Sequence, residues 1–480
     1  MIFDGIPYTQ YAESASADPK LKRARLFVEF IERKLGARFM YDARNLALQR
    51  PDLSRALMIA HRLEERGIVK SLRRFSTLPD EPALRQWVAL CGGAKGNAVG
   101  GSSVDDDEAA ILATLAEGLE RYLWSTQSDY FLKPLHATSA EIAKRGTYIA
   151  PERFAGFSIS QREIDPELQL TPATKYLWIQ GASLVSGKKT FLPAQTVSGI
   201  HQHSGTFAKE PLIRGKITTG LATWPTRAGA RLAGALEVIE RDAYMIMWLN
   251  QLTLPRILLA PLASKSDSLK TLLDRCARYR LKVHAVQMIT DAPTHAMCVV
   301  VEDISGHDPK YFLGLRAHRS LTHAIEKATL EALRGRIRYR NWSAQNKWDP
   351  QTPLDRIGHT ERVYYWGTAE NSSGLDFLVR GKEIEATSAV WEDDSPEQHL
   401  DKIIAWCRTA GYECVSVSLG TSRVNPTPWH VEMVVIPELQ PLHLTERRRH
   451  LGGKRLKSIP EKFGYTPRSE PFIDAPQPFA

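Results

Sequence analysis

The sequence predicts an α+β fold in which antiparallel sheets are flanked by long helices. Two observations support this fold class. Short apolar runs separated by turns, such as Tyr176–Ile179 and Thr190–Leu192, are typical of antiparallel strands. Apolar residues recur at helical spacing over Leu321–Arg340 and around Ala235–Asp242, so these segments are expected to be helices.

The composition narrows the class of protein. Of the 480 residues, 43% are hydrophobic and 24% are charged, which is ordinary for a globular protein. Lys and Arg outnumber Asp and Glu by 63 to 54, and the resulting net charge of +9 favours phosphate-bearing or acidic ligands. No RRM, KH or zinc-finger pattern is present in the sequence, so we expect no nucleic-acid partner.

The cysteines and the N-terminus indicate the compartment. The five cysteines form no C-x-x-C pair, which argues against a structural zinc site and suits a reducing cytosol. The N-terminus lacks the pattern of a signal peptide, and no apolar run in the sequence is long enough to span a bilayer. We therefore expect a cytoplasmic protein without a membrane partner.

Residues 1–88 are predicted to form an N-terminal helical region. Helices are expected over residues 21–39, 52–68 and 83–90, after a polar start. The region can be a structural cap on the next domain or a docking surface for a partner, and its residues do not decide between the two. The next domain is expected to span residues 89–460.

A glycine-rich stretch, Cys91–Val104, leads into the first helix of this domain. Such a stretch is either a plain turn or a backbone cradle for phosphate at a helix N-terminus, and it lacks the order of a Walker motif. A second turn rich in small residues, Thr218–Ala222, leads into the helix around Ala235–Asp242. The order of turn and helix thus occurs twice.

Both of these helices contain the pattern E-x-x-E-R. One copy comprises Glu117, Glu120 and Arg121, and the other comprises Glu237, Glu240 and Arg241. Residues three and four apart share a helix face, so each copy presents two carboxylates beside a guanidinium. For one copy, a solvated ion pair is the simpler interpretation. Two copies among apolar residues favour a divalent cation between the carboxylates, and Mg²⁺ binds both carboxylate and phosphate oxygens.

The remaining elements are predicted from the same patterns. The long helix Leu321–Arg340 carries a third polar cluster of Glu331, Arg334 and Arg336. A basic exposed face is the alternative, and it is the preferred interpretation for Arg338 and Arg340. Residues 342–395 are expected to be irregular. The other predicted elements are a helix over residues 265–280, strands at Ala182–Val185, Val283–Ile289 and Met297–Glu302, a helix at Leu400–Ala410, and strands at Glu413–Leu419 and Trp429–Ile436.

The last segment, residues 461–480, is predicted to be a proline-rich tail. It ends in the sequence A-P-Q-P-F-A, in which Pro476 and Pro478 favour an extended, stiff chain. The tail is either a frayed terminus or a rod that enters a site.

Six short motifs together resemble the YcaO family of ATP-dependent enzymes that modify peptide backbones. In chain order they are Ala94–Gly96, Ala116–Tyr122, Thr218–Ala222, Leu236–Ala243, Ala328–Arg336 and Ile436–His443. The resemblance implies a YcaO-like fold with an ATP and Mg²⁺ site built from several helices. It assigns Mg²⁺ to Glu117, Glu120, Glu237, Glu240 and Glu331, and it assigns contacts with the nucleotide to these residues and to Lys95, Arg121, Arg241, Arg334 and Arg336.

The tail indicates the subfamily. Azoline-forming members of the family, the cyclodehydratases of thiazole/oxazole-modified microcin pathways, often end in P-x-P-x-P. Here Pro476 and Pro478 match the first two prolines, and Ala480 stands in place of the third. The resemblance implies that a Cys, Ser or Thr side chain of a ribosomal precursor peptide attacks the preceding carbonyl, whose oxygen is phosphorylated by ATP and then lost. Our hypothesis is that the tail places a terminal carboxylate near the substrate as a base.

The resemblance also implies partners. Because the chain lacks a four-cysteine zinc site, we expect a separate ThiF-like, leader-peptide-binding protein, and a flavin dehydrogenase can belong to the same complex. We expect a homodimer within that hetero-complex. Two departures from the family pattern, Ala113 in place of Ser and Arg334 in place of Gln, leave open a non-catalytic ATP-binding scaffold. A thioamide synthetase with a TfuA-type partner is the other alternative.

Overall fold

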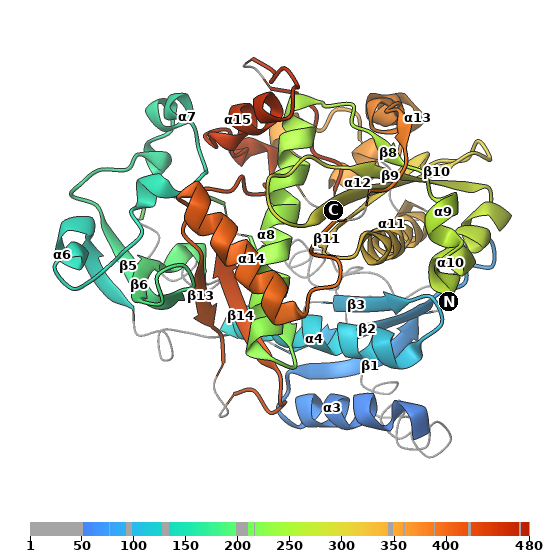
Figure 1. Cartoon of the computed structure of the whole chain (residues 1–480), viewed down its shortest axis with the longest axis horizontal. Helices are drawn as coiled ribbons and strands as arrows, with labels where there is room; N and C mark the ends of the chain where they lie inside the picture. The colour runs from blue at the N-terminus through green and yellow to red at the C-terminus, as the bar shows by residue number, and fades with distance from the viewer. Residues whose placement is uncertain are drawn as a thin grey trace, which may run out of the picture.

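The three-dimensional arrangement is taken from a computed structural model. It describes residues 51–75, 77–92, 98–126, 134–197, 210–215, 217–343, 349–358, 361–387, 389–420, 424–469 and 472–479. The helix expected over residues 21–39 lies outside these ranges. The described chain forms three sheets and several long helices, which confirms the α+β prediction (Figure 1).

The first sheet has three antiparallel strands. In the order β1-β2-β3 they are Val69–Phe75, Arg85–Cys91 and Ala98–Ser103. Helix α4 (Asp107–Thr126) packs against β2 and β3, and α3 (Ser54–Glu65) packs against β1 and α4. The helix predicted over residues 83–90 is wrong, because this segment is the central strand β2. Its backbone pairs on both sides and its Trp87 is buried, so sheet pairing overrides local propensity.

The glycine-rich stretch is partly strand. Gly100 and Gly101 belong to β3 rather than to a turn, while residues 93–97 lie outside the described ranges. A Cβ atom at Gly101 would lie 2.4 Å from the carbonyl oxygen of Ala110, so glycine allows α4 to approach the sheet this closely. The expectation of a turn over all of Cys91–Val104 is therefore wrong.

The second sheet is antiparallel and has six strands. In the order β4-β5-β13-β14-β7, with β6 paired to β5, they are Leu135–Thr138, Lys175–Ser183, Val415–Ser418, His430–Val435, Leu221–Trp224 and Lys189–Pro193. The strands expected at Tyr176–Ile179 and Ala182–Val185 form the single strand β5 up to Ser183.

The turn before β7 is confirmed: Gly220 has φ of +94°, and a Cβ there would lie 2.1 Å from the carbonyl oxygen of Val434.

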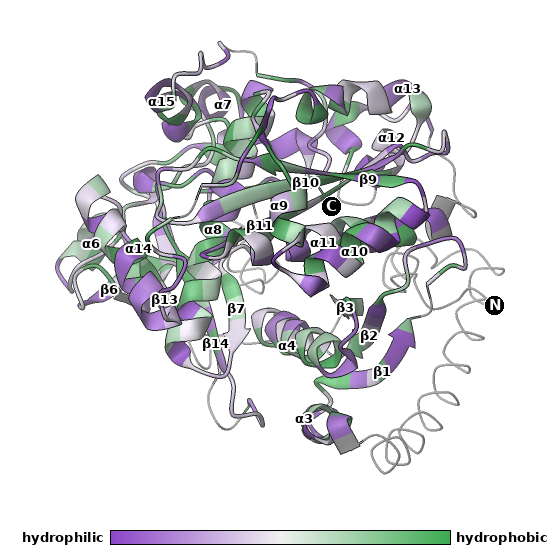
Figure 2. Cartoon of the chain, turned by 45° about the vertical axis from the view of Figure 1, so that its right-hand side comes forward, coloured by the Kyte–Doolittle hydropathy of each residue, from purple (hydrophilic) through white to green (hydrophobic). Residues whose placement is uncertain are grey.

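The third sheet has the strand order β11-β10-β9-β8-β12. These strands are Tyr311–His318, His295–Asp303, Leu281–Gln287, Arg256–Ile257 and Glu383–Ile384, and only the β8–β12 pair is parallel within this sheet. Helix α11 (Leu321–Ser343) packs on β11 and β10, and α10 (Asp267–Arg278) packs on β9. Strand β10 is hydrophobic along most of its length (Figure 2). The prediction did not include β11.

Helix α8 (Arg227–Asn250) runs through the centre of the molecule (Figure 1). All seven residues of Ala243–Leu249 are fully buried, because α8 is surrounded by the second sheet, β11, α14 and α15. The remaining helices are α6 (Ser139–Ala143), α7 (Ile159–Ile164), α9 (Ala260–Ala263), α12 (Glu361–Trp366), α13 (Ala369–Ser372), α14 (Pro396–Ala410) and α15 (Arg455–Lys462).

The predicted division of the chain stays a prediction. Strand β2 crosses the boundary between residues 1–88 and 89–460, so the two parts share one sheet. The described part of residues 461–480 is not a frayed end, since Phe472 and Phe479 are buried in the same core as α8. Of the helices within the described ranges, none is long and apolar enough to cross a membrane.

Candidate ATP and magnesium site

Three predicted glutamates accept a hydrogen bond from a backbone N–H group in, or directly before, the strand on which their own helix packs. A carboxylate oxygen of Glu117 on α4 accepts a hydrogen bond from the backbone N–H of Gly100 in β3, at 3.4 Å. On α8, Glu237 accepts from the N–H of Gly220 at 3.0 Å, and on α11, Glu331 accepts from the N–H of Leu315 at 2.7 Å. Each carboxylate is thereby oriented by a backbone donor.

The other two glutamates connect neighbouring layers of the fold. Glu120 of α4 accepts a 2.6 Å hydrogen bond from the N–H of Thr223 in β7, which belongs to the second sheet. Glu240 of α8 accepts a 2.7 Å hydrogen bond from the N–H of Ala317 in β11, which belongs to the third sheet. The second glutamate of each E-x-x-E-R pattern therefore joins its helix to the next sheet.

The arginines of the two patterns lie against these carboxylates. Arg121 pairs with Glu117 at 3.4 Å and donates a short hydrogen bond to the hydroxyl of Thr218. Arg241 pairs with Glu240 at 3.0 Å and with Glu237 at 3.5 Å. Burial alone would lower the pKa of Arg241, but the charges of Glu240 and Glu237 raise it above its ordinary value. Both arginines therefore stay cationic.

The carboxylates lie close enough to change each other's ionisation. Burial raises the pKa of Glu120 to about 8, and the charges of Glu117 and Glu237 add to this effect against the opposing charge of Arg121. Burial likewise raises the pKa of Glu240 to about 7, with Arg241 opposing the shift and Glu331 adding to it. Glutamates from three helices thus share one electrostatic environment, in which Arg121 and Arg241 offset part of the negative charge.

These residues fit Mg²⁺ together with phosphate better than Mg²⁺ alone. Among the described residues, no three His, Cys, Asp or Glu side chains could hold a metal ion by themselves. Mg²⁺ is usually held in proteins by one or two carboxylates and completes its octahedron with water and phosphate oxygens. The raised pKa values of Glu120 and Glu240 show where a cation would relieve repulsion. The five-glutamate assignment itself stays a prediction.

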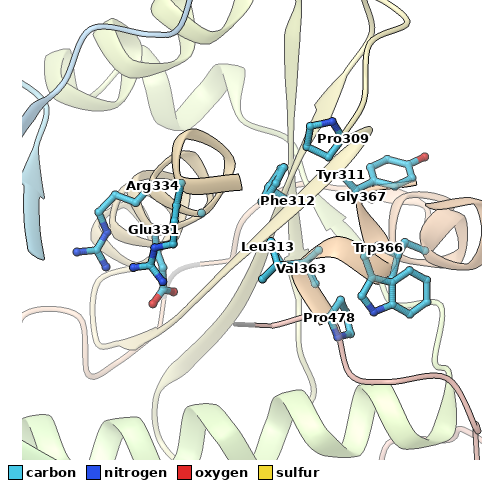
Figure 3. A pocket seen from close by; sticks show the side chains of 13 residues that line it. Pro309, Tyr311, Phe312, Leu313, Glu331, Arg334, Val363, Trp366, Gly367 and Pro478 are labelled. Atoms are coloured by element: carbon cyan, nitrogen blue, oxygen red, sulfur yellow. The ribbon is translucent and has the colours of Figure 1, made fainter. Parts of the chain in front are cut away.

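A cavity adjoins the third cluster, on α11 (Figure 3). One wall is charged and contains Glu331, Arg334 and Arg338. The opposite wall is apolar and consists of Phe312, Leu313, Val363, Trp366 and Pro478 among others. Arg334 also donates a short hydrogen bond to the carbonyl oxygen of Gly100, so α11 is tied to β3 beside Glu117. The cavity therefore extends from the carboxylates toward the proline-rich tail.

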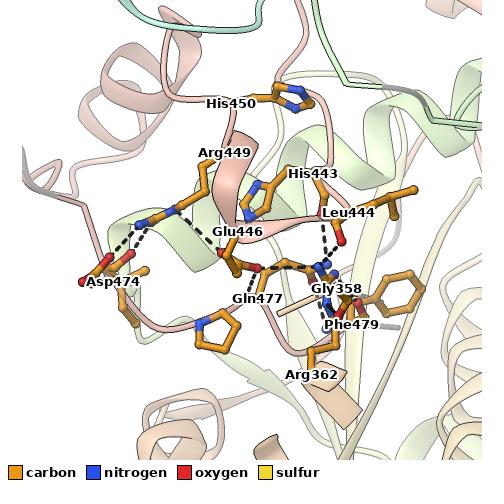
Figure 4. A network of polar contacts seen from close by, with 12 residues as sticks. Gly358, Arg362, His443, Leu444, Glu446, Arg449, His450, Asp474, Gln477 and Phe479 are labelled. Atoms are coloured by element: carbon orange, nitrogen blue, oxygen red, sulfur yellow. Dashed lines mark hydrogen bonds and ion pairs between the residues drawn. The ribbon is translucent and has the colours of Figure 1, made fainter. Parts of the chain in front are cut away.

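The tail enters this region of the molecule. The indole N–H of Trp366 donates a 2.8 Å hydrogen bond to the carbonyl oxygen of Pro476, and Pro478 lines the cavity. The guanidinium of Arg362 donates to the carbonyl oxygen of Phe479 at 3.1 Å (Figure 4). The described tail residues are therefore buried rather than frayed, and the entry of the tail into a substrate site stays a prediction.

Two predicted contacts cannot be placed and one is wrong. Lys95 and Ala480 lie outside the described residues. Arg336 does not join the carboxylate cluster. Its buried guanidinium binds Glu81 at 3.0 Å and Asp303 at 2.7 Å, and it donates to the carbonyl oxygen of Pro309 at 3.2 Å. Arg336 lies on a different face of α11 from Glu331, because the two residues are five apart and an α-helix has about 3.6 residues per turn.

Several residues of the site were absent from the prediction. The N–H donors of Leu315 and Ala317 lie on β11, for which no strand was predicted. Arg362 and Trp366 lie on α12, within the segment expected to be irregular. The only sequence signal for α12 is a single turn of apolar residues, which is too short to show a period.

Comparison with known proteins shows which family and fold the chain resembles. A family model described as YcaO cyclodehydratase, ATP- and Mg²⁺-binding, matches residues 101–440. A curated protein of Methanothermobacter thermautotrophicus, described as uncharacterized, is 25% identical over 179 residues, which are 36% of this chain and 45% of that protein.

Solved structures share the fold. A heterocyclase in complex with substrate and cofactor has a TM-score of 0.69 at 19% identity, over 87% of this chain and 57% of that chain. YcaO from Methanopyrus kandleri, bound with AMPPCP and Mg²⁺, has a TM-score of 0.57 at 16% identity, over 80% and 90% of the two chains. The E. coli microcin synthetase McbBCD complex with pro-MccB17 bound has a TM-score of 0.52 at 14% identity, over 76% and 87%.

The coverage limits what these similarities show. The chain spans only about half the length of the curated relative and of the heterocyclase, at 45% and 57%. At these identities, the solved structures establish the fold.

The pH dependence of metal binding follows from the raised pKa values. At pH 6 Glu120 and Glu240, whose pKa values are about 8 and 7, are mostly protonated, and Mg²⁺ requires the ionised form. We predict that the affinity for Mg²⁺·AMPPCP rises from pH 6 to pH 8 and then levels off, with release of protons. Calorimetry in buffers of different ionisation enthalpy measures both effects. Equal affinity at pH 6 and 8 without proton release would contradict the prediction, and Glu120→Gln should remove part of the release.

The same shifts predict how the metal-free protein responds to pH. A carboxyl whose pKa is raised in the folded state favours folding while it is protonated. This stabilisation is complete below the ordinary pKa of 4.5 and is lost as the pH rises through about 7 to 8. Denaturant titrations should therefore show that Glu240→Gln loses less stability than the parent chain between pH 6 and pH 9. An equal loss of stability in both proteins would contradict the raised pKa of Glu240.

Replacement of Arg336 tests its separation from the site. Arg336→Gln leaves the buried carboxylate of Asp303 without its cationic partner and leaves Glu81 paired with Arg340 alone, so we expect a loss of about 3–5 kcal/mol in the free energy of unfolding. Urea denaturation measures this loss. At temperatures where the variant stays folded, Mg²⁺·AMPPCP should bind as in the parent chain; loss of binding without loss of stability would restore Arg336 to the site.

Proposed function

Because the chain belongs to the YcaO cyclodehydratase, ATP- and Mg²⁺-binding family, we propose that it is an ATP-dependent peptide cyclodehydratase that forms azolines. The product is a thiazoline or an oxazoline, made from Cys, Ser or Thr residues of a ribosomal precursor peptide. The observation that carries the proposal is the meeting of glutamates from α4, α8 and α11 beside a cavity that the tail also enters.

The nucleotide end of the site is the glutamate cluster. Glu117, Glu120, Glu237, Glu240 and Glu331 would hold Mg²⁺ in pairs, with phosphate oxygens as the remaining ligands. Arg121, Arg241 and Arg334 lie among or beside them and supply positive charge for phosphate. The cation and the arginines together offset repulsion between the carboxylates and the phosphates.

The peptide end of the proposed site is the cavity of Figure 3. Its charged wall contains Glu331 and Arg334, and its apolar wall contains Phe312, Trp366 and Pro478. A peptide carbonyl held between these walls would have the nucleotide cluster on one side and the tail on the other. The apolar wall would bind a peptide side chain and exclude water from the reacting amide.

The reaction needs a better leaving group than an amide oxygen. When bound, ATP would supply it by phosphorylating this oxygen, after the substrate thiol or hydroxyl has added to the carbonyl carbon and lost its proton to water. The carbon–oxygen bond breaks, phosphate leaves, and the amide nitrogen gives up its proton to form the C=N bond. Our proposal is that the tail directs a terminal carboxylate that takes this proton, with Pro476, Pro478 and Ala480 as the residues that place it.

We include the partners in the proposal. A separate ThiF-like, leader-peptide-binding protein would deliver the precursor, a flavin dehydrogenase would oxidise the azoline, and the subunit would form a homodimer within this complex. The McbBCD structure, whose fold this chain shares, is a synthetase complex with its peptide bound. Residues 1–88 are the proposed docking or cap region, and 461–480 the functional tail.

Turnover and product mass test the proposal. Synthetic peptides with internal Cys, Ser or Thr should cause release of phosphate from Mg²⁺·ATP and should lose the mass of one water for each ring formed. A product in which sulfur replaces oxygen would instead favour a thioamide synthetase with a TfuA-type partner. Nucleotide binding without release of phosphate, with every peptide and partner supplied, would favour a non-catalytic scaffold.

A glutamate variant tests the role of the cluster in turnover. Glu237→Gln keeps the size of the side chain and removes its charge, so we expect peptide-dependent phosphate release to fall by about 100-fold. Glu163→Gln on α7, an exposed position, serves as the matched control and should leave the rate unchanged. Phosphate release by the Glu237 variant at the parent rate would contradict this role.

A further inference from the structure

Phe479 joins the tail to the nucleotide cluster. The guanidinium carbon of Arg241 lies 4.3 Å from the centre of the Phe479 ring, which is the geometry of a cation–π contact. The same guanidinium pairs with Glu240 at 3.0 Å and Glu237 at 3.5 Å. Arg241 therefore lies between the tail and two of the glutamates assigned to Mg²⁺.

The ring is held in place from its other side and by its own backbone. Phe479 is only 7% exposed and packs edge-on against Tyr244, with ring centres 5.8 Å apart. Its N–H donates to the side-chain oxygen of Gln477 at 2.9 Å and to the hydroxyl of Tyr244 at 3.2 Å. Its carbonyl accepts from Arg362 at 3.1 Å. Every polar backbone atom of Phe479 thus has a buried partner.

A buried carboxylate completes this support (Figure 4). Glu446 accepts from the N–H of Gln477 at 3.2 Å, and it pairs with Arg362 at 3.6 Å and with His443 at 3.2 Å. Burial would raise the pKa of Glu446, but its bond to His443 and the nearby Arg362 and Arg449 hold that pKa below its ordinary value. The carboxylate therefore stays charged and holds the backbone of the tail in place at Gln477.

We propose that Phe479 is a positioning residue that couples the tail to the nucleotide site through Arg241. This inference rests on the proposed function. The ring covers one face of the guanidinium and limits its movement, so Arg241 stays beside Glu237 and Glu240. With the tail in place, the two carboxylates are oriented before the nucleotide arrives. Without the ring, Arg241 gains freedom and the carboxylates lose that orientation.

The coupling must act in both directions. If the bound tail strengthens nucleotide binding, nucleotide binding must hold the tail in place by the same factor. Two results follow: loss of the ring weakens binding of the nucleotide, and binding of the nucleotide slows opening of the tail. A purely structural Phe479 would produce neither effect once the protein is folded.

Nucleotide affinity in variants of the full chain tests the first result. Phe479→Leu keeps an apolar side chain but removes the ring, and we expect Mg²⁺·AMPPCP to bind about three- to tenfold more weakly, as measured by calorimetry. Phe479→Tyr keeps the ring and should restore most of the affinity. Phe377→Leu is the control, since Phe377 is a buried aromatic of the same core that packs on Trp248 instead of Arg241. It should bind as the parent chain does.

Hydrogen exchange of the parent chain tests the second result and needs no variant. Saturating Mg²⁺·AMPPCP should slow exchange of the Gln477 and Phe479 amides by about three- to tenfold, while Phe479→Leu should show little nucleotide-dependent slowing. Equal affinity of Phe479→Leu and the parent chain, or an unchanged exchange rate in the parent chain, would overturn the coupling while leaving the proposed function standing. Failure of the parent chain to bind Mg²⁺·AMPPCP would overturn both.

Discussion

The fold depends on hydrogen bonds between glutamate carboxylates and backbone N–H groups of strands. An exposed carboxylate needs no such bond, but a buried one must be paired or hydrogen-bonded to offset its lost hydration. Here Glu120 accepts a hydrogen bond from the N–H of Thr223, and Glu240 accepts one from the N–H of Ala317. Helix α4 is thereby joined to the second sheet and α8 to the third. The residues assigned to the cofactor also hold the three layers together.

This double role has a physical cost that the ligand would offset. The hydrogen bonds orient the carboxylates, but burial keeps the pKa values of Glu120 and Glu240 near 8 and 7. A site that is preorganised for a cation is less favourable without one, because like charges converge in a region of low dielectric. The buried tail belongs to the same arrangement, since Phe479 covers the guanidinium that serves Glu237 and Glu240.

The sequence predicted which glutamates pair on each helix, but it did not predict the strand whose N–H groups bind two of them. Spacing alone placed Glu117 with Glu120 and Glu237 with Glu240, because the helical period is local. Strand β11 was missed although its N–H groups hold Glu240 and Glu331, since pairing partners are set by distant residues. Residues 83–90 were assigned to a helix because the run Trp87–Cys91 is apolar throughout and shows no alternation of polar and apolar residues. The assignment of Arg336 to the nucleotide came from the family resemblance. The residues that Arg336 contacts in the structure, Glu81 and Asp303, are distant from it in the sequence.

The most direct test of the converging glutamates is to locate the metal itself. A crystal of the protein with AMPPCP and Mn²⁺ in place of Mg²⁺ gives an anomalous signal at each metal position. Our account predicts that every such peak lies within coordination distance of carboxylates from α4, α8 or α11, with at least one peak bound by glutamates of two different helices. A nucleotide-bound Mn²⁺ that contacts none of these five glutamates would contradict it.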